Sequence, residues 1–447
     1  MTPVMASLFG IFVAFVILVA GAMKGYPILV VAPIATTVVV AFSGLSVFDT
    51  LDGAFAEGLG GFIISNFTLF LPACIMGALL ADCGAARDIA VYFGNLAERF
   101  GGKHVKYWVV MGLSIVTALL SLGGVSGAVV VFTIAPICRQ IFKKLDIPWH
   151  FVIPIIVYGG CMWTATLPGS PCIENLIPID YLGTTPMAAA PLGFIATGNC
   201  IIFGAAYIWY AVRKTEKRGE GYQLTGAVMD AYADDLDKTI LTATCTNMQL
   251  LKALAPSIVL LVAMNVFHLE PYVSLICGCL VCLMLYYNKF RNLGKTLSSG
   301  CVSTISSLMN VAVVVGFGAG VELTPGFDFI VENLANIPGP PLVQLWFSAN
   351  LIAGITGSAA GGEGIALGAL SDRFLAMGIS PEVIHRIVNV SCYGLDTMPY
   401  NGNAINRLNY CHLTYRNAYY HEFILGAIFP VFNSFIVTMI ASAGLFM

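Results

Sequence analysis

Two related stretches of sequence decide the fold: Thr164-Ala-Thr-Leu-Pro-Gly-Ser-Pro-Cys-Ile-Glu-Asn175 in the first half of the chain and Leu395-Asp-Thr-Met-Pro-Tyr-Asn-Gly-Asn-Ala-Ile-Asn406 in the second. Three pairs of residues match between them at one offset of 231 positions: Thr166 and Thr397, Pro168 and Pro399, and Asn175 and Asn406. A proline lacks the backbone donor and clashes with the preceding turn, so each stretch predicts a break in a helix. Three positions in register indicate an internal repeat.

A turn rich in small residues precedes each break. The first is Ser121-Leu-Gly-Gly-Val-Ser-Gly127, and the second is Thr356-Gly-Ser-Ala-Ala-Gly-Gly-Glu-Gly364. The uncharged run that holds the first turn, 107–138, is too long for one membrane crossing and too short for the roughly 40 residues of two crossings. We therefore expect a re-entrant hairpin at each turn, since non-helical backbone at membrane depth must be buried in protein or face a water-filled cavity.

The composition is typical of a chain that crosses a membrane many times. Of the 447 residues, 10% are charged, where a soluble protein carries roughly a quarter, and 58% are hydrophobic. Uncharged runs such as 4–23 are long enough to cross hydrocarbon. A net charge of −3, with basic residues in short clusters between apolar runs, excludes a nucleic-acid partner. The 13 cysteines are scattered through apolar runs, so we expect no metal site, no disulfide and no cofactor.

The lysines and arginines predict the orientation, because cytoplasmic loops retain positive charge. With the first hairpin re-entrant, 19 of the 21 basic residues fall inside, and the exceptions are Arg373 and Arg386. The acidic segments 43–61 and 322–341 contain no lysine or arginine and fall outside. The first hairpin then opens from the cytoplasm and the second from outside, so the repeats are inverted and both chain termini lie outside.

The sequence therefore predicts an all-α polytopic membrane protein with about 10–12 membrane segments, built from two inverted-topology repeats that each contain a re-entrant hairpin and a broken transmembrane helix. Five regions are expected: N-terminal scaffold spans at 1–61, a first repeat at 62–212, a cytoplasmic linker at 213–250, scaffold spans at 251–295 and a second repeat at 296–447. The hairpins are placed at 107–138 and 340–378, and the broken helices at 149–185 and 383–416.

Inverted repeats with broken helices are typical of secondary transporters, which bind substrate near the bilayer midplane where the breaks meet. Free N–H groups at a half-helix N-terminus favour a carboxylate, whereas carbonyls at C-terminal ends favour Na⁺ or a proton relay. The breaks and hairpin turns offer neutral donors and acceptors, which suit a small carboxylate bearing hydroxyl groups. The expected substrate-binding residues are Ser121, Gly123, Gly124, Ser126, Gly127, Thr164, Thr166, Pro168, Gly169, Ser170 and Asn175 from the first repeat, and Thr356, Gly357, Ser358, Thr397, Pro399, Asn401, Asn403 and Asn406 from the second.

Two acidic residues at membrane depth are the candidates for ion coupling, because buried ionisable groups in a bilayer are costly and usually functional. Glu363 lies at the tip of the second hairpin, and Asp396 lies beside the second Thr-x-Pro. Alternatively, Glu363 caps the following hairpin arm and Asp396 pairs with a neighbour such as Arg407. Glu174, at the first break, is interpreted as an ordinary acid at a helix start.

Three stretches carry a resemblance to a known family: Gly77-Ala-Leu-Leu-Ala-Asp-Cys-Gly-Ala-Ala-Arg87, the turn 121–127, and Leu167-Pro-Gly-Ser-Pro-Cys-Ile-Glu-Asn175 continuing to Tyr181-Leu-Gly-Thr-Thr-Pro186. In these the sequence resembles the gluconate:proton symporter (GntP-type) family, within the wider group of organic-anion and ion transporters. The resemblance implies proton symport of a sugar acid such as gluconate, or of a hydroxycarboxylate, in a bacterial inner membrane. It also implies elevator-type movement of a transport domain against a dimeric scaffold, and hence a homodimer.

An enzyme is disfavoured because the sequence contains no His-Glu-x-x-His pair, no Gly-x-Ser-x-Gly elbow and no Walker-type loop, and we assign no catalytic residue. Within transport, the alternatives are sodium-coupled carboxylate symport and cation/proton antiport. A channel is less favoured, since a selectivity filter usually recurs by symmetry about a pore, whereas these repeats invert within one chain. The expected partners are a small carboxylate, a coupling proton or sodium ion, the lipid bilayer and a second copy of the chain.

Overall fold

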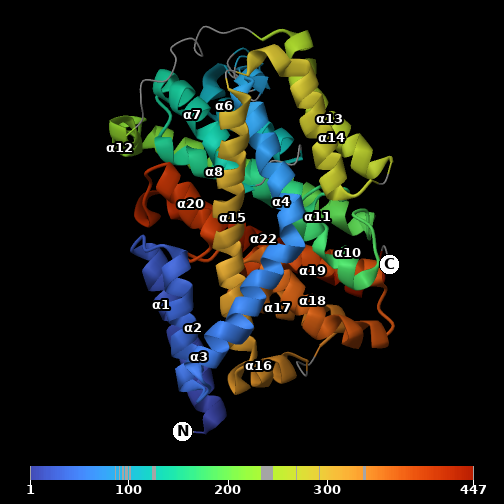
Figure 1. Cartoon of the computed structure of the whole chain (residues 1–447). Helices are drawn as coiled ribbons and strands as arrows, with labels where there is room; N and C mark the ends of the chain where they lie inside the picture. The colour runs from blue at the N-terminus through green and yellow to red at the C-terminus, as the bar shows by residue number, and fades with distance from the viewer. Residues whose placement is uncertain are drawn as a thin grey trace.

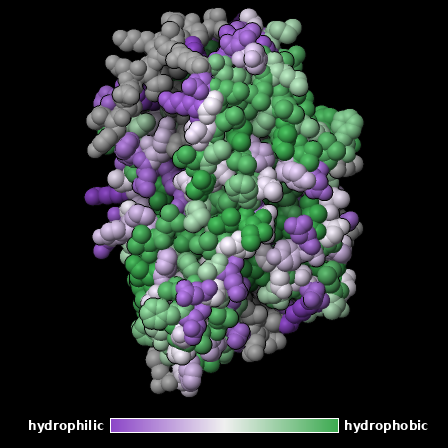
Figure 2. All heavy atoms as spheres, viewed as in Figure 1, coloured by the Kyte–Doolittle hydropathy of each residue, from purple (hydrophilic) through white to green (hydrophobic). Residues whose placement is uncertain are grey.

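The computed structural model describes residues 2–85, 87–89, 91–92, 95, 99, 102–122, 127–232, 245–267, 269–290, 292–335 and 339–445, and this part of the chain is helical without a strand (Figure 1). Eight of its helical segments are long and apolar enough to cross a bilayer. They are Pro3–Gly21, Val47–Asp82, Val105–Leu122, Ala190–Lys217, Asn247–Met264, Tyr272–Lys289, Leu293–Glu322 and Tyr415–Ser442. Hydrophobic residues cover much of the face shown in Figure 2. The chain is a polytopic membrane protein.

The eight long spans are fewer than the 10–12 membrane segments expected from the sequence, and several other helices are shorter than a full span. Two apolar helices, α2 (Ile28–Phe42) and α17 (Pro341–Thr356), are shorter than a full span. The two stretches that contain Thr-x-Pro divide their helices into shorter pieces.

Two long helices, α4 (Ala56–Asp82) and α15 (Leu293–Glu322), pack along each other through much of the molecule (Figure 1). Small residues permit this close packing. A Cβ at Gly58 of α4 would lie 2.6 Å from the Cβ of Ala319, and a Cβ at Gly316 of α15 would lie 2.8 Å from the carbonyl oxygen of Phe55. The glycines therefore fix how closely the two backbones approach.

Two helical hairpins pack against this long pair. The first consists of α1 (Pro3–Met23) and α2, followed by α3 (Val47–Thr50) and the π-helical η1 (Leu51–Phe55), and it packs against α15 and α16 (Pro325–Ala335). The second consists of α13 (Asn247–Asn265) and α14 (Pro271–Tyr286), followed by η7 (Tyr287–Lys289), and α14 packs against α4. These hairpins lie in the regions expected to form scaffold spans.

The remaining helices occur in two sets of similar order. The first set is η2 (Gly102–His104), α6 (Val105–Leu122), α7 (Gly127–Leu145), η3 (Trp149–Phe151), α8 (Val152–Val157), η4 (Tyr158–Met162), α9 (Trp163–Thr166), η5 (Ile173–Asn175), α10 (Ile177–Leu182) and α11 (Ala190–Lys217). The second set is α17, α18 (Ala359–Ala376), α19 (Pro381–Leu395), α20 (Gly402–Tyr410), η8 (Tyr415–Tyr419), α21 (Tyr420–Phe423), η9 (Ile424–Ile428) and α22 (Phe429–Ser442). Each set is a helix pair, an interrupted helix and a long closing helix.

The two sets pack into each other. Helix α11 of the first contacts α22 of the second, and α10 contacts both α18 and α19. One apolar core surrounds α6–α8 and extends to α4 and α14, and another surrounds α17–α19 and includes Leu192 and Ala196 of α11. The interrupted helices are therefore held between elements from both halves of the chain.

The segment expected to be a cytoplasmic linker contains one further helix, α12 (Gln223–Tyr232). Asp230 on α12 accepts hydrogen bonds from Arg139 Nε and from the Tyr222 hydroxyl at 2.8 and 2.9 Å, and Lys143 Nζ lies 2.8 Å from its other oxygen. Burial alone would raise the pKa of Asp230, but these hydrogen bonds outweigh it and lower the pKa. The contacts join α12 to the end of α7.

Candidate functional site

The first break begins where α9 ends. Leu167 is extended and Gly169 adopts φ +76°, a conformation that glycine takes without strain. The chain then returns on itself, since Gly169 N donates to Pro186 O at 3.0 Å. The amide of Asn175 secures the same loop by donating to the carbonyl oxygens of Ser170 and Pro186 at 3.0 and 3.1 Å. Asn175 therefore holds the shape of the break.

A buried arginine from the other half of the chain completes this loop. Arg386 on α19 is 0% exposed and donates five hydrogen bonds, all to neutral oxygens. The acceptors are Ala188 O (3.0 and 2.8 Å), Pro186 O (3.2 Å), Asn175 Oδ1 (3.0 Å) and Asn389 Oδ1 (3.2 Å). A guanidinium fits such a set because its donors are fixed in a plane. The sequence held a signal for this residue, as Arg386 is one of two basic residues that the charge pattern leaves outside the cytoplasm.

Helix α19 continues this contact along one face. Asn389 Nδ2 donates to Glu174 O at 3.0 Å, and the Tyr393 hydroxyl donates to Glu174 Oε2 at 2.8 Å. Residues three and four positions apart share a helix face, which aligns Arg386, Asn389 and Tyr393. The second half of the chain thus positions both the backbone and the side chain of Glu174.

The second break is joined to the second helix pair. Asn401 caps α20, since its Oδ1 accepts from Ala404 N at 2.9 Å, and its Nδ2 donates to Gly357 O at 3.2 Å. Ser358 caps α18 by accepting from Gly361 N at 3.1 Å. The Tyr400 hydroxyl donates to Gly354 O at the end of α17. The N-termini of α18 and α20 are therefore brought to the same place.

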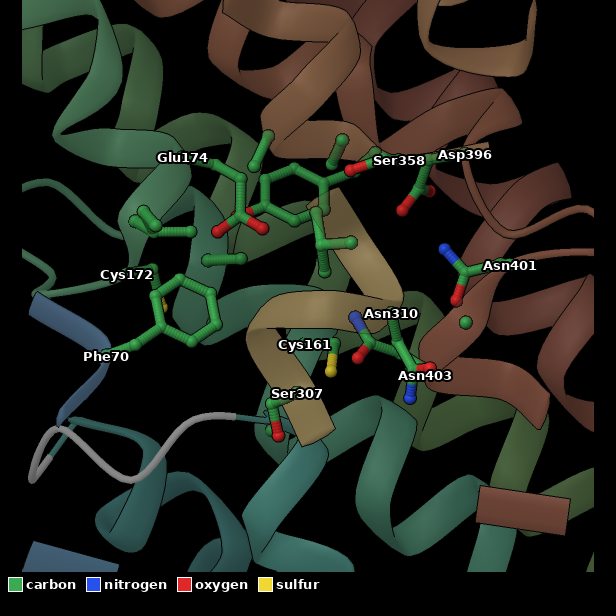
Figure 3. A pocket seen from close by; sticks show the side chains of 18 of the residues that line it. Phe70, Cys161, Cys172, Glu174, Ser307, Asn310, Ser358, Asp396, Asn401 and Asn403 are labelled. Carbon is green, nitrogen blue, oxygen red and sulfur yellow. The ribbon is translucent and has the colours of Figure 1, made fainter. Parts of the chain in front are cut away.

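A cavity of about 140 Å³ lies where the two breaks and the tip between α17 and α18 face the long pair α4 and α15. Its polar lining comes from several elements (Figure 3): Ser121, Glu174, Ser307, Asn310, Ser358, Tyr393, Asp396, Asn401 and Asn403, with the thiols of Cys161 and Cys172. Leu69 and Phe70 of α4 contribute an apolar side. Asn310 Nδ2 also donates to Asn406 Oδ1 at 3.3 Å.

A smaller cavity of about 60 Å³ shares Cys161, Glu174, Tyr393, Asp396, Asn401 and Asn403 with the larger one. It adds Thr166, Thr397 and Arg407 to the lining. Arg407 is 3% exposed and donates to both carboxylate oxygens of Glu422, which is 0% exposed. The charge of Arg407 is therefore already balanced by a buried partner, and Glu422 is a buried acid that the sequence interpretation did not single out.

The geometry supports binding of a small anion with hydroxyl groups. Ser358 to Ala360 at the start of α18 and Asn401 to Asn403 at the start of α20 line the cavity, so two helix N-termini face it. Helix N-termini carry partial positive charge and free N–H groups, which favour carboxylates. Within the described part of the chain, no three His, Cys, Asp or Glu side chains converge in a way that could hold a metal ion.

Comparisons with known proteins find transporters. The chain is 28% identical over 450 residues to the uncharacterized transporter YxjC of Bacillus subtilis, with 92% of this chain and 93% of that protein covered. It is 22% identical over 394 residues to the high-affinity gluconate transporter of Escherichia coli, with 86% of each chain covered. An uncharacterized transporter of Haemophilus influenzae is also 22% identical, over 340 residues and 74% of each chain.

The chain is a homologue of transporters. The expected resemblance to the gluconate:proton symporter family is confirmed by these relatives. No protein-family model matches the sequence.

The structure brings six of the residues predicted from the sequence to the larger cavity: Ser121, Gly357, Ser358, Asp396, Asn401 and Asn403. Thr166 and Thr397 line the smaller cavity. A third group lies in the same breaks and turns outside the lining of both cavities: Thr164, Pro168, Gly169, Ser170, Asn175, Thr356, Pro399 and Asn406. Gly127 is the first residue of α7, and Gly123, Gly124 and Ser126 lie outside the described residues.

The two predicted coupling acids occupy different surroundings. Asp396 lines both cavities and accepts from the Thr397 hydroxyl at 2.9 Å. Glu363 on α18 is 0% exposed, lies outside the lining of both cavities, and neither of its carboxylate oxygens has a hydrogen-bond partner among the described residues. Glu174, interpreted as a helix-start acid, does precede α10, and its side chain also lines both cavities.

Proposed function

We propose that the chain is a secondary active transporter that carries a small organic anion, a sugar acid such as gluconate or a hydroxycarboxylate, together with protons. The observation that carries the proposal is the cavity in which the N-termini of α18 and α20 meet neutral amide and hydroxyl groups. The N-termini favour the carboxylate of such a substrate. Asn310, Asn403 and Ser307 offer hydrogen-bond partners to its hydroxyls.

The gluconate transporter among the relatives supports this class of substrate. A hydroxylated anion also fits the chemistry of the cavity better than a purely apolar one, because unpaired buried amides are costly. The apolar side formed by Leu69 and Phe70 belongs to α4. This apolar side lies opposite the polar residues of the breaks, so the cavity has one apolar side and one polar side.

We further propose that the cavity opens alternately to the two sides of the membrane by an elevator-type movement. A groove of about 880 Å³ lies on the other side of the start of α18, and Ala360 lines both the groove and the cavity. The wall between them is therefore thin, as alternating access requires. In this proposal the helix pairs are re-entrant hairpins of two inverted repeats, the termini lie outside a bacterial inner membrane, and α1, α2, α13 and α14 belong to a dimeric scaffold.

The coupling acids in this proposal are Asp396, in the cavity, and Glu363, buried behind it. Both lie in the second half of the chain, close to the tip between α17 and α18. A proton bound there would neutralise negative charge next to the anion. Replacement of either acid by its amide is expected to reduce accumulation driven by a pH gradient more than it reduces exchange of substrate.

The test is uptake of labelled gluconate into proteoliposomes under an imposed proton gradient and, separately, a sodium gradient. Unlabelled hydroxy acids and sugar acids serve as competitors. Proton-driven uptake that one competitor blocks supports the proposal. Uptake driven by sodium alone contradicts proton coupling. If no anion is taken up under either gradient, ion-coupled symport of a small organic anion is contradicted.

One residue tests the site itself. Asn403 lines the cavity, whereas Asn409 lies exposed on the same helix, α20. Asn403→Ala is expected to weaken gluconate binding about tenfold or more, since a hydrogen bond in a buried site contributes about 0.5–1.5 kcal/mol and its partner is left unpaired. Asn409→Ala is the matched control and is expected to transport as wild type does. Equal affinities in the two variants would remove Asn403 from the site.

A further inference from the structure

The charges around the cavity are unbalanced for a site that takes an anion. Glu174 and Asp396 both line it, and among the described residues of its lining there is no Lys, Arg or His. Figure 3 shows both carboxylates directed into the cavity. Two ionised acids there would repel the substrate that the helix N-termini attract.

The two buried arginines near the cavity form no ion pair with Glu174 or Asp396. Arg407 lines the smaller cavity and is paired with Glu422. Arg386 donates all five of its hydrogen bonds to the first break and to Asn389, outside the cavity lining. Each helix N-terminus contributes about half a positive charge. The two N-termini together balance one carboxylate and leave the second unbalanced.

We propose that Glu174 acts together with Asp396 in proton coupling, so that the cavity accepts the anion only after one of these two carboxyl groups, the carboxyl pair, has taken up a proton. The inference rests on the proposed function and adds Glu174 to it. A proton on the pair brings the formal charge of the cavity, with its two helix N-termini, to about zero before the substrate enters. Two carboxyl groups that share one site titrate as a unit, because the first to ionise opposes ionisation of the other.

The groups near Glu174 and Asp396 either keep one protonation state near neutral pH or lie outside the cavity lining. Those that titrate or carry charge are Cys161 on η4, Cys172 before η5, Cys392 and Tyr393 on α19, Tyr400 before α20, Arg407 on α20, Tyr419 on η8, Glu422 on α21 and Glu363 on α18. Phenols ordinarily titrate near pH 10 and thiols near 8.5, so they keep their protons at pH 7. Glu422 is held by Arg407, and Glu363 is outside the lining.

Glu174 has the geometry of a group that can gain and lose a proton in place. Tyr393 donates to Oε2, and Asn389 fixes the backbone carbonyl of the same residue. The side chain is therefore held at the cavity by contacts that do not depend on a cation. Asp396 is held in the same way, by the hydroxyl of Thr397.

The first arm of the test needs no substrate. Infrared spectra of the purified protein are recorded across pH 5–9 and followed in the carbonyl stretch of protonated carboxyl groups. The wild-type band at neutral pH is expected to lose the same part of its intensity in Glu174→Gln and in Asp396→Asn, because one remaining acid is balanced by the two helix N-termini and ionises. Any contribution of the buried Glu363 is common to the wild type and the variants and cancels in the difference spectra. Glu57→Gln, an exposed acid near the start of α4, is the matched control and keeps the band. Retention of the wild-type band in both cavity variants would overturn the proposal.

The second arm measures the dissociation constant of gluconate against pH. Uptake of one proton with the anion makes the wild-type constant rise about tenfold per pH unit above the titration of the pair. Glu174→Gln is expected to bind with a constant that changes less than twofold over the same range. A full tenfold slope in Glu174→Gln would contradict the pair.

The two arms separate the inference from the function on which it rests. If the infrared band behaves as expected and no anion of the panel binds, the substrate class is wrong and the carboxyl pair stands. If proton-driven gluconate uptake is found, yet neither variant changes the band or the slope, the transport function stands and the pair is refuted.

Discussion

Replacement of Arg386 by methionine tests a buried contact between the two halves of the chain. Arg386 is fully buried and serves four oxygen acceptors, of which Pro186 O keeps two other donors, Gly169 N and Asn175 Nδ2. Three acceptors, at Ala188, Asn175 and Asn389, lose the guanidinium without compensation. A buried acceptor left unsatisfied costs about 1–3 kcal/mol, so the loss is at least about 3 kcal/mol.

This lower bound lies at the upper end of the about 0.5–3 kcal/mol that most single substitutions cost. A buried ion pair is often replaced by apolar residues without loss, but that requires removal of both partners. Here the partners of Arg386 are backbone and amide oxygens that remain in the variant. We therefore expect a large decrease in the free energy of unfolding.

The assay is reversible unfolding in mixed micelles by titration with a denaturing detergent, followed by tryptophan fluorescence. Arg386→Lys is the second variant, because lysine keeps the charge but offers only three donors and no planar fork, and its loss should be intermediate. The exposed Arg416 supplies the control, and Arg416→Met should change the free energy of unfolding by less than about 0.5 kcal/mol. An Arg386→Met protein as stable as the Arg416→Met protein would refute the reasoning.

Two further predictions concern packing and pH. A Cβ at Gly362 would lie 2.4 Å from the Cα of Ala353, so Gly362→Ala should separate α17 from α18 and lower the free energy of unfolding by about 1–3 kcal/mol. A Cβ at Gly364 meets only ordinary contacts, so Gly364→Ala is the control, and the thermal midpoints of the two variants check the prediction. Asp230 has a lowered pKa in the folded protein, so its contribution to stability is complete above its ordinary pKa of 3.8 and is lost as pH falls through the lowered value. Asp230→Asn should therefore lower the thermal midpoint at pH 7, and the difference from wild type should close at low pH; a constant difference would show that protonation of Asp230 is not involved.

The places where the helices end could be predicted from the sequence because proline acts locally. Thr166 ends α9 and Leu395 ends α19, each within a few residues of the Thr-x-Pro that predicts the break. The helix pair α17 and α18 turns at Gly357, which adopts φ +63°. A left-handed turn of this kind needs a glycine at one position, and the sequence shows it directly.

The orientation of side chains within the breaks could not be predicted in the same way. Asn175 and Glu174 are adjacent, yet Glu174 lines the cavity and Asn175 is 0% exposed and holds Arg386. Which of these two side chains lines the cavity depends on contacts with α19, more than 200 positions later in the chain. A local sequence pattern carries no information on so distant a partner. From the sequence alone, Glu174 is therefore recognisable only as an acid at a helix start.

The contact between Arg386 and Asn175 also has a consequence for synthesis of the protein. The two residues are 211 positions apart, and ribosomes add about 5–20 residues per second. The loop of the first break therefore exists for about 10–40 s before its arginine has been made. During that interval its carbonyl oxygens need water or a temporary protein partner. The first half of the chain is therefore synthesised before Arg386 is available, and the first break completes its hydrogen bonds only after the second half has been made.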